Sequence, residues 1–332
     1  MSRGASGGGF VERSMRTTLS WLSHRRTLGR IATKVPFTRP MVARFVAGES
    51  LEAALPALDR ARAGGFLTTV DILGEAVSSS AAATAAADGY LRTLPVLVEH
   101  GLELNVSLKP TQMGLGIGSG VVAANIGRIL DAAAAHGGFV RIDMEDHTTT
   151  DATLGLFREL RPRIQGRGPG GTGDVGVVIQ SALKRSAADV EALIAEGARV
   201  RLCKGAYKEP ASVAFQDRHE VDAAYVRLAE RLLADGAYPA IATHDDAMVD
   251  AAIAYATAHG IGPERFEFQM LHGIRRDLQE RLVAEGWRVR VYVPFGREWW
   301  AYFMRRLAER PQNVTFLIRT VLLEGRGASP KR

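Results

Sequence analysis

Short apolar segments alternate with longer amphipathic segments along most of this chain. Eight runs rich in β-branched and other apolar residues begin near Phe66, Leu102, Phe139, Val175, Arg199, Pro239, Phe266 and Arg288. The stretches between them repeat apolar residues at the three-to-four-residue spacing of helices. Strands that alternate with helices pair in parallel through right-handed crossovers, and eight such units close into a barrel. The alternation therefore predicts an α/β fold with a (β/α)8 barrel.

Glycine marks the ends of many of the predicted helices. A glycine just past the last helical turn supplies the left-handed residue that ends a helix, and six predicted helices stop at Gly101, Gly137, Gly197, Gly236, Gly260 and Gly286. Ser186 to Asp189 has the spacing of a capping box that opens the helix before Gly197. Two or three helical stretches precede the barrel, the last of them over Leu51–Ala63.

Two glycine-rich segments interrupt this pattern. The segment 114–120 lacks the spacing of a dinucleotide-binding fingerprint and has no strand immediately before it, so the alternative of a doubly wound open sheet lacks its signature. We interpret it as a flexible loop or lid that leads into a helix capped by Ser119. The segment 166–173 is expected to be a surface loop without chemistry.

Composition narrows the class of protein. The 332 residues are 46% hydrophobic and 23% charged, which allows a large core and excludes general disorder. No apolar run reaches the roughly 18 residues that span a bilayer. The single cysteine, Cys203, permits no internal disulfide and fits a reducing compartment. We expect a soluble, cytoplasmic protein.

The net charge of +6 is concentrated near the N-terminus. Residues 1–50 hold nine basic and two acidic side chains, which leaves 33 basic and 34 acidic for the rest. The net positive charge therefore belongs to one segment and not to the rest of the chain. Because the chain also has no recognised nucleic-acid-binding motif, we expect no nucleic-acid partner. We predict a basic tail and helical segment over residues 1–44, the catalytic barrel over 45–324 and a tail over 325–332.

Polar residues stand at the carboxyl end of every predicted strand, where the active site of such a barrel lies. Burying charged groups there is costly unless they are used. These residues are Asp71, Glu75, Lys109, Asp143, Glu145, Gln180, Arg201, Cys203, Lys204, Thr243, His244, Asp245, Gln269, His272 and Tyr292. Any one of them has a structural ion pair as its simplest explanation, but all eight strand ends together favour a site.

The last predicted helix adds a possible clamp. At helical spacing Tyr302, Arg305, Arg306 and Glu309 share one face. Two adjacent guanidinium groups offer paired donors that match a carboxylate. A solvated surface helix is the alternative for this segment taken alone.

Several of these segments together resemble the proline dehydrogenase family. The resemblance runs in order from about Phe45 to Leu323 and rests on the segments 70–75, 107–112, 141–146, 178–180, 200–207, 242–245 and 302–309. It implies a distorted (β/α)8 barrel that binds FAD non-covalently, with a final helix covering the active site. It also implies oxidation of L-proline to Δ1-pyrroline-5-carboxylate, the first step of proline catabolism to glutamate, with electrons passed to a membrane quinone.

The resemblance also implies roles for individual residues. The proline carboxylate would be held by Arg305 and Arg306 with Lys109 as a third basic contact, and the ring would be contacted by Tyr292, Tyr302 and Leu271, with Glu75 paired to Arg305 as a gate. Gln180 would bond the flavin pyrimidine edge, and Arg201 would lie near flavin N5, which takes hydride from proline C5. The other implied flavin contacts are Met144, Lys204, Gly205, Ala206, Tyr207, Thr243 and His244. Asp143, with Arg201, would be catalytic, and Asp143 and Tyr207 would belong to the polar network behind the flavin.

The resemblance also has implications for partner proteins and for location in the cell. Because the chain stops soon after its final predicted helix, we expect a separate pyrroline-5-carboxylate dehydrogenase to process the product. A cytoplasmic enzyme with peripheral contact to the inner membrane fits a quinone acceptor, and the basic segment is a candidate for that contact.

Two other enzyme classes fit parts of the pattern. Lys109 or Lys204 at a strand end could form a Schiff base, as in barrel aldolases. His244, Asp245, Asp143 and His272 could instead bind a metal for hydrolysis, although the first strand has no His-x-His pair. The aldolase reading leaves the two arginines and a glutamine without a role.

Overall fold

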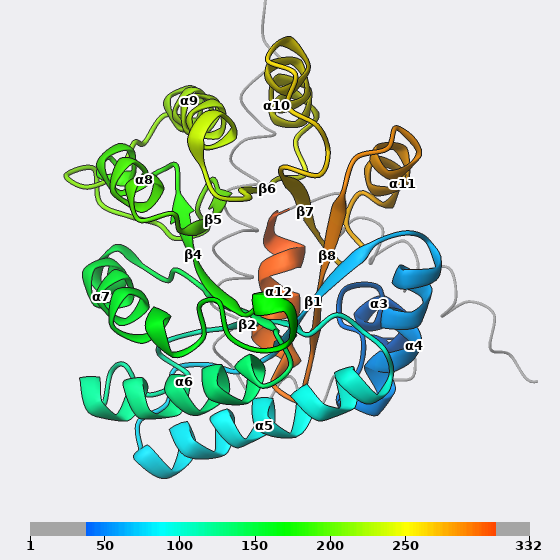
Figure 1. The fold of residues 1–332 in the computed structure, drawn as a ribbon, viewed down its shortest axis with the longest axis vertical. Coiled ribbons are helices and arrows are strands. Elements are labelled where there is room, and N and C mark those ends of the chain that lie inside the picture. The colour runs from blue at the N-terminus through cyan, green and yellow to red at the C-terminus, as the bar shows by residue number, and fades with distance from the viewer. Residues whose placement is uncertain (1–37, 310–332) are drawn as a thin grey trace, which may run out of the picture.

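The computed structural model describes residues 38–309, in which eight parallel strands close into a barrel (Figure 1). Each strand pairs with the next along the chain, and the last pairs with the first. The strands are β1 (Leu67–Ile72), β2 (Asn105–Leu108), β3 (Phe139–Ile142), β4 (Asp174–Gln180), β5 (Arg199–Cys203), β6 (Ala240–Ala242), β7 (Glu267–Leu271) and β8 (Val289–Phe295). The predicted barrel is confirmed, with β3 and β5 ending two or three residues earlier than the sequence pattern suggested.

Seven α-helices connect the strands and form the outer ring (Figure 1). They are α5 (Ser80–Glu99), α6 (Ser119–Ala134), α7 (Thr150–Leu160), α8 (Ser186–Ala195), α9 (Arg218–Asp235), α10 (Asp246–Ala258) and α11 (Arg276–Ala284). Short 3-10 helices, η1 (His147–Thr149), η2 (Arg161–Arg163) and η3 (Pro169–Gly171), lie in the β3–β4 connection.

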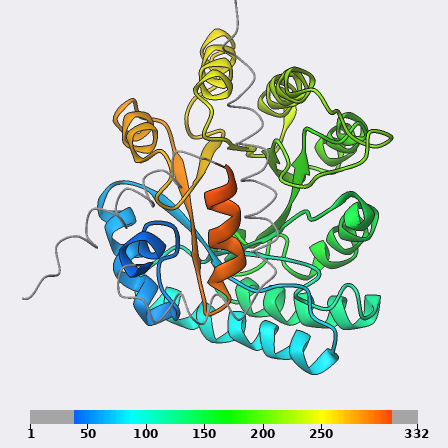
Figure 2. The same ribbon diagram turned by 180° about the vertical axis from the view of Figure 1, so that it is seen from behind.

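The helices at the two ends of the described chain break the regular arrangement. Two helices, α3 (Thr38–Phe45) and α4 (Leu51–Ala63), precede β1, and α4 packs outside the barrel against β1 and β8. The helix after β8, α12 (Trp299–Glu309), does not join the ring but lies across one end of the barrel (Figure 2). Because Arg306 of α12 shares a cavity with the carboxyl ends of the strands, that end is the one expected to hold the active site.

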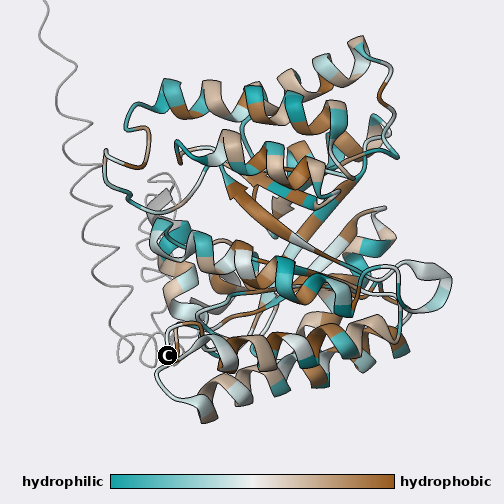
Figure 3. Ribbon diagram, turned by 60° about the vertical axis from the view of Figure 1, so that its left-hand side comes forward, coloured by the Kyte–Doolittle hydropathy of each residue, from teal (hydrophilic) through white to brown (hydrophobic). Residues whose placement is uncertain are grey.

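Alternation along the strands separates an apolar layer from a polar interior. On β5, Val200 and Leu202 are fully buried in the main hydrophobic cluster between strands and helices, whereas Arg201 between them bonds to side chains across the barrel. The strands are largely brown in Figure 3, and the helices mix hydrophobic and hydrophilic residues along their length. The helix-facing layer supplies most of the core, and the lumen holds mainly polar side chains.

A second, smaller hydrophobic cluster fixes α12 in place. It joins α3, the end of β1 and α12 through Phe45, Val46, Leu73, Trp299, Tyr302, Phe303 and Met304. Gly273 lets the β7–α11 connection approach the end of α3, since a Cβ there would lie 1.7 Å from the Arg44 carbonyl oxygen. The helix that covers the site is therefore held by packing rather than by its own propensity.

Three predictions about helix ends are wrong in detail. Five of the six glycines have a positive φ, but Gly236 has φ −74 and is not left-handed. Gly118, not Ser119, stands at the N-cap of α6, where no side chain caps the helix. The helix α8 begins at Ser186 itself, whose hydroxyl donates to the Gln180 carbonyl at 2.6 Å and so forms no capping box.

The two glycine-rich segments differ in structure. Residues 166–172 are exposed and confirm the predicted surface loop. The segment after Lys109 is a series of hydrogen-bonded turns in which Gln112 and Met113 are buried, and its role as a lid stays a prediction. Residues 1–37 and 310–332, which include most of the basic segment and the C-terminal tail, lie outside the described residues. None of the helices between residues 38 and 309 has the length and apolarity needed to cross a bilayer.

Candidate active site

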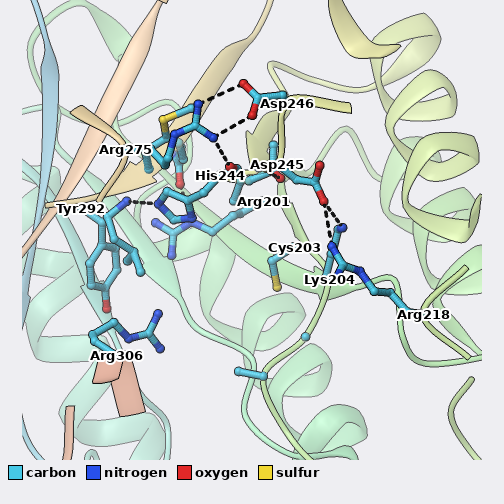
Figure 4. A pocket seen from close by; sticks show the side chains of 17 residues that line it. Arg201, Cys203, Lys204, Arg218, His244, Asp245, Asp246, Arg275, Tyr292 and Arg306 are labelled. Atoms are coloured by element: carbon cyan, nitrogen blue, oxygen red, sulfur yellow. Dashed lines mark hydrogen bonds and ion pairs between the residues drawn. The ribbon is translucent and has the colours of Figure 1, made fainter. Parts of the chain in front are cut away.

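A cavity of about 600 Å³ opens at the carboxyl ends of β5 to β8, within the range usual for small-molecule sites (Figure 4). Nine of the predicted site residues line it: Arg201, Lys204, Gly205, Ala206, Thr243, His244, Leu271, Tyr292 and Arg306. They come from four neighbouring strands or their following loops and from α12. The structure thus brings together residues that are up to 105 positions apart in the sequence.

Arg201 is held at the floor of this cavity by three hydrogen bonds from three directions. Its Nε donates to Gln269 Oε1 at 2.5 Å, one terminal nitrogen to Asp143 Oδ1 at 2.7 Å and the other to Ser107 Oγ at 2.9 Å. Its guanidinium carbon lies 5.4 Å from the centre of the Tyr292 ring. The side chain is buried, so this cation is fixed in position and poorly screened by water.

Lys109 extends the same network on the β2 side. Its Nζ donates to both oxygens of Asp71 at 2.9 and 3.0 Å, and it lies 3.8 Å from Asp143. Burial opposes the charged form, but the two carboxylates outweigh it and raise the pKa of Lys109. The Tyr292 hydroxyl donates to Asp143 at 3.2 Å, and burial raises the pKa of Tyr292 well above its usual value, with Asp143 and Asp71 adding to the effect. Lys109 is therefore a cation and Tyr292 a neutral phenol at pH 7.

Three charged residues, Lys204, Arg218 and Asp245, also line the cavity (Figure 4). Lys204 is paired with Asp222 at 2.5 Å and with Asp245 at 2.8 Å. Arg218 lies 3.6 Å from each of the same two carboxylates. The lysine is therefore held in place, and two acidic groups offset its charge and that of the arginine.

The main chain approaches Gln180 closely at Gly205. Gly205 has φ 110, and a Cβ there would lie 2.9 Å from Gln180 Oε1, so a side chain at this position would push into the glutamine. The Gln180 amide nitrogen donates to the Glu145 carbonyl at 2.7 Å, which fixes the orientation of the amide. The Glu145 carboxylate in turn accepts from the Thr111 backbone at 2.9 Å and from its hydroxyl at 2.6 Å.

His244 is locked between two loops. Its Nε2 accepts a hydrogen bond from the Leu271 backbone at 2.8 Å, which places the proton of the neutral ring on Nδ1. Arg275 donates to the His244 carbonyl at 3.2 Å and binds both oxygens of Asp246 at 2.8 and 3.0 Å (Figure 4). These contacts connect a predicted flavin residue to Leu271, a predicted substrate residue.

The predicted clamp on α12 divides into a buried and an exposed part. Tyr302 is buried in the smaller cluster, and the Arg306 guanidinium lies 5.2 Å from its ring centre. Arg305 is exposed, as is Glu75 beyond the end of β1, and the ion pair between them stays a prediction. The side chain of Glu309 lies outside the described residues.

Three further predicted residues lie around the cavity without lining it. Asp143 follows β3 and joins the network described above. Met144, the next residue, is buried in the main hydrophobic cluster, whereas Tyr207 lies on the loop after β5 with 46% of its surface exposed. Their roles toward a flavin stay predictions.

Several residues that organise the site had no role assigned to them from the sequence. Ser107 and Gln269 bind Arg201 directly, Asp71 binds Lys109, and Glu145 orients Gln180. Their positions on alternate residues of β1, β2 and β7 or just after β3 were a usable signal, because such residues point into the lumen.

The geometry does not favour the two other enzyme classes. A Schiff base needs a neutral amine, whereas two carboxylates keep Lys109 protonated and Lys204 is paired with two others. Within residues 38–309 no three histidine, cysteine or acidic side chains are arranged to bind a metal ion, and Asp143 is occupied by Arg201 and Tyr292. Burial raises the pKa of Cys203 to about 11, so this thiol lines the cavity as a poor nucleophile.

Comparison with known proteins gives a consistent family. Residues 54–319 match the family model described as proline dehydrogenase. The chain is 44% identical over 282 residues to a proline dehydrogenase of Deinococcus radiodurans, which covers 84% of this chain and 89% of the relative. It is 37% identical over 308 residues to proline dehydrogenase 1 of Bacillus subtilis, covering 93% of this chain and 99% of the relative.

A solved structure has the same fold. The chain is similar to proline utilization A (PutA) from Bdellovibrio bacteriovorus inactivated by N-propargylglycine, with a TM-score of 0.74 and 28% sequence identity. The match covers 81% of this chain and 32% of that protein. The likeness therefore concerns about a third of a longer polypeptide.

Proposed function

The chain belongs to the proline dehydrogenase family, and from this premise we propose that it oxidises L-proline to Δ1-pyrroline-5-carboxylate with FAD as its flavin. One observation in particular supports the proposal. The fixed cation Arg201 and the α12 arginine Arg306 line the same cavity, so one positive group can act on a redox cofactor while another binds a carboxylate.

The substrate carboxylate would bind between α12 and the barrel. Arg306 offers paired donors to a carboxylate from α12, and Arg305 is its neighbour on the same helix. Lys109, kept protonated by Asp71, supplies a third positive charge from the β2 side. Fixing the carboxylate from two sides orients the ring, which brings the reacting carbon to one place.

The residues present fit a flavin. The cavity volume suits a large ligand, and its donors include Arg201, Lys204 and His244. Gly205, which also lines the cavity, has no side chain that would push into Gln180. We infer that Gln180, Arg201, Lys204, Gly205, Ala206, Thr243 and His244 hold FAD, with Met144 and Tyr207 at its edges. When bound, FAD accepts at N5 the hydride that leaves proline C5.

The side chains around Arg201 provide the electrostatics of the reaction. The Arg201 guanidinium stabilises negative charge that develops beside it. Because Asp143 and Ser107 already hold this guanidinium in place, it need not move during the reaction. The proline amine must be neutral to release hydride, and Asp143, which binds Arg201 and Tyr292, is a carboxylate of the network beside the cavity. Tyr292 and Tyr302 with the smaller hydrophobic cluster would exclude water from this side.

Electron acceptor, partners and location follow from the same proposal. The electrons would pass to a membrane quinone, and a separate pyrroline-5-carboxylate dehydrogenase would consume the product. The enzyme would work in the cytoplasm, with peripheral contact to the inner membrane through its basic N-terminal segment.

The test is product formation by the FAD-loaded protein. With L-proline and a soluble quinone analogue, we expect reduction of the analogue and a product that o-aminobenzaldehyde traps as the pyrroline-5-carboxylate adduct. D-proline is the control, because the carboxylate clamp fixes only one enantiomer with C5 at the proposed ring position. Absence of the adduct from FAD-loaded protein would overturn the proposal.

A further inference from the structure

The hydrogen bonds that fix Arg201 continue below the cavity into the barrel. Arg201 Nε donates to the Gln269 amide oxygen at 2.5 Å, and the Gln269 amide nitrogen donates to Glu267 Oε1 at 2.5 Å. Glu267 also accepts from Arg290 Nε at 2.8 Å and from the Tyr238 hydroxyl at 3.2 Å. Gln269 and Glu267 both lie on β7, two residues apart, and both are buried.

The direction of these hydrogen bonds depends on the negative charge of Glu267. A glutamine amide can present either its oxygen or its nitrogen to a neighbour, and the two ends have similar shape. A carboxylate accepts hydrogen bonds only, so Glu267 binds the amide nitrogen and turns the oxygen toward Arg201. Burial favours the protonated form of Glu267, but Arg290 and the bonds from Arg290 and Gln269 outweigh it, and the pKa of Glu267 is lowered.

We propose that Glu267 and Gln269 are positioning residues, in which Glu267 orients the Gln269 amide and Gln269 thereby holds Arg201 against the cavity. The inference rests on the proposed function, because Arg201 matters only if a flavin lies beside it. Glu267 contributes through Gln269 and does not itself line the cavity. The two positioning residues thus form one unit that connects the ion pairs at the base of the lumen to the redox site.

Sulfite gives a readout that is independent of turnover. It adds reversibly to protein-bound flavin and leaves a negative charge on the ring, so its dissociation constant reports a nearby fixed cation. Gln269→Leu removes the oxygen that holds Arg201 Nε. We expect the sulfite dissociation constant to rise about tenfold, the equivalent of one hydrogen bond to a charged group.

Asn125→Leu is the matched control. Asn125 on α6, in the outer ring of helices, is as buried as Gln269 and does not line the cavity, and its amide nitrogen donates to the Met113 carbonyl at 3.1 Å. This variant should lose similar thermal stability while keeping the sulfite affinity of the unchanged protein. Equal sulfite affinity in the Gln269→Leu and Asn125→Leu proteins would overturn the proposal.

A double-variant cycle tests whether Glu267 acts through Gln269. Glu267→Gln alone should also weaken sulfite binding, because an amide at this position no longer selects the orientation of Gln269. The double variant Glu267→Gln with Gln269→Leu should bind sulfite like Gln269→Leu alone. If the two substitutions instead weaken sulfite binding additively, Glu267 does not act through Gln269, and that part of the proposal is overturned.

Two outcomes separate this inference from the proposed function. If the unchanged protein binds no flavin, the proposed function is overturned, and the proposed role of Glu267 and Gln269 is overturned with it. If only Gln269→Leu is purified without flavin, FAD affinity measured by fluorescence quenching replaces the sulfite assay. A loss of FAD affinity greater than in Asn125→Leu then supports the proposal, and an equal loss overturns it.

Discussion

The two halves of the barrel lumen use the same kinds of side chain in different ways. In the half near the N-terminal ends of the strands, Arg290 binds Glu267 at 2.8 Å, Glu103 at 2.7 and 3.0 Å and the Thr68 carbonyl at 2.7 Å. In the other half, Arg201, Lys204 and Arg306 line an open cavity. At the base of the lumen the charged side chains pair with one another, whereas at the top they line a cavity that can hold a ligand.

The base of the lumen is filled by guanidinium groups packed on aromatic rings. The Arg199 guanidinium carbon lies 4.3 Å from the Phe139 ring centre and 4.7 Å from that of Tyr238. Arg141 also stacks on Phe139, at 4.6 Å, and donates to the Val177 and Arg199 carbonyls. Charged side chains inside this barrel therefore have two uses: those that line the cavity can bind a ligand, and those paired at the base stabilise the fold.

The base of the lumen should give the largest effect on stability. Arg290→Met removes the principal partner of the buried Glu267, and an unpaired buried charge destabilises by about 3–5 kcal/mol. Urea denaturation measures this. The control is Arg128→Met, which breaks an exposed ion pair with Asp88 and should change the unfolding free energy by less than about 1 kcal/mol. Similar losses in both variants would remove the distinction between the two kinds of pair.

The top of the lumen should instead show an effect on binding. Arg306→Ala removes one side of the proposed carboxylate clamp, so the proline concentration for half-maximal flavin reduction should rise about 100-fold or more. The thermal midpoint should hardly change. Arg297→Ala, at an exposed arginine just before α12, should titrate like the unchanged protein. If both variants titrate alike, Arg306 does not bind the substrate.

His272, a half-buried histidine that does not line the cavity, should make stability depend on pH. Burial lowers the pKa of His272 to about 4, with Arg276 and Arg60 adding to the effect. Between pH 6.5 and 4 the unfolded chain binds a proton that the folded one does not, so stability falls as pH falls, by about 2 kcal/mol. In urea denaturation at several pH values, His272→Gln should flatten this slope, whereas His219→Gln, at an exposed residue, should not. An unchanged slope in His272→Gln would contradict the prediction.

The smallest effects should come from two matched tyrosines. Tyr292→Phe removes the bond that the hydroxyl donates to Asp143 at 3.2 Å and the one it accepts from Lys109 at 3.4 Å. Asp143 keeps a shorter bond from Arg201, and Lys109 keeps a shorter bond to Asp71. The rate of flavin reduction should fall less than about tenfold. Tyr238→Phe removes a bond to Glu267 at the base and should leave the rate unchanged. A hundredfold loss in Tyr292→Phe would show that its hydroxyl takes a direct part in the reaction.

Much of the fold and part of the site could be predicted from the sequence. The short runs rich in β-branched and other apolar residues and the glycines after helices located all eight strands. The polar strand ends included Arg201, Lys204, Thr243, His244 and Tyr292, which line the cavity. What could not be predicted depends on contacts across the barrel. Gly176 is required because a Cβ there would lie 2.4 Å from an Arg141 nitrogen, a neighbour 35 residues away.

The unpredicted residues of the site have the same physical cause. Gln269 was visible as a strand-end polar residue, but its link to Arg201 depends on β5 and β7 facing each other across β6. Glu267, at the start of β7, gave no signal of its own. The wrong caps at Ser119 and Ser186 are local errors, since a serine hydroxyl near a helix start can bond to other backbone groups.

We propose that the open half of the lumen holds a flavin and L-proline together, and the absorption spectrum of the FAD-loaded protein during anaerobic titration with L-proline tests this. We expect the flavin bands to bleach as proline is added, and Arg306→Ala to shift this titration to higher concentrations. A protein that binds FAD and keeps its yellow colour at saturating proline, or that binds no FAD, would show that this half of the lumen does not bring the two together.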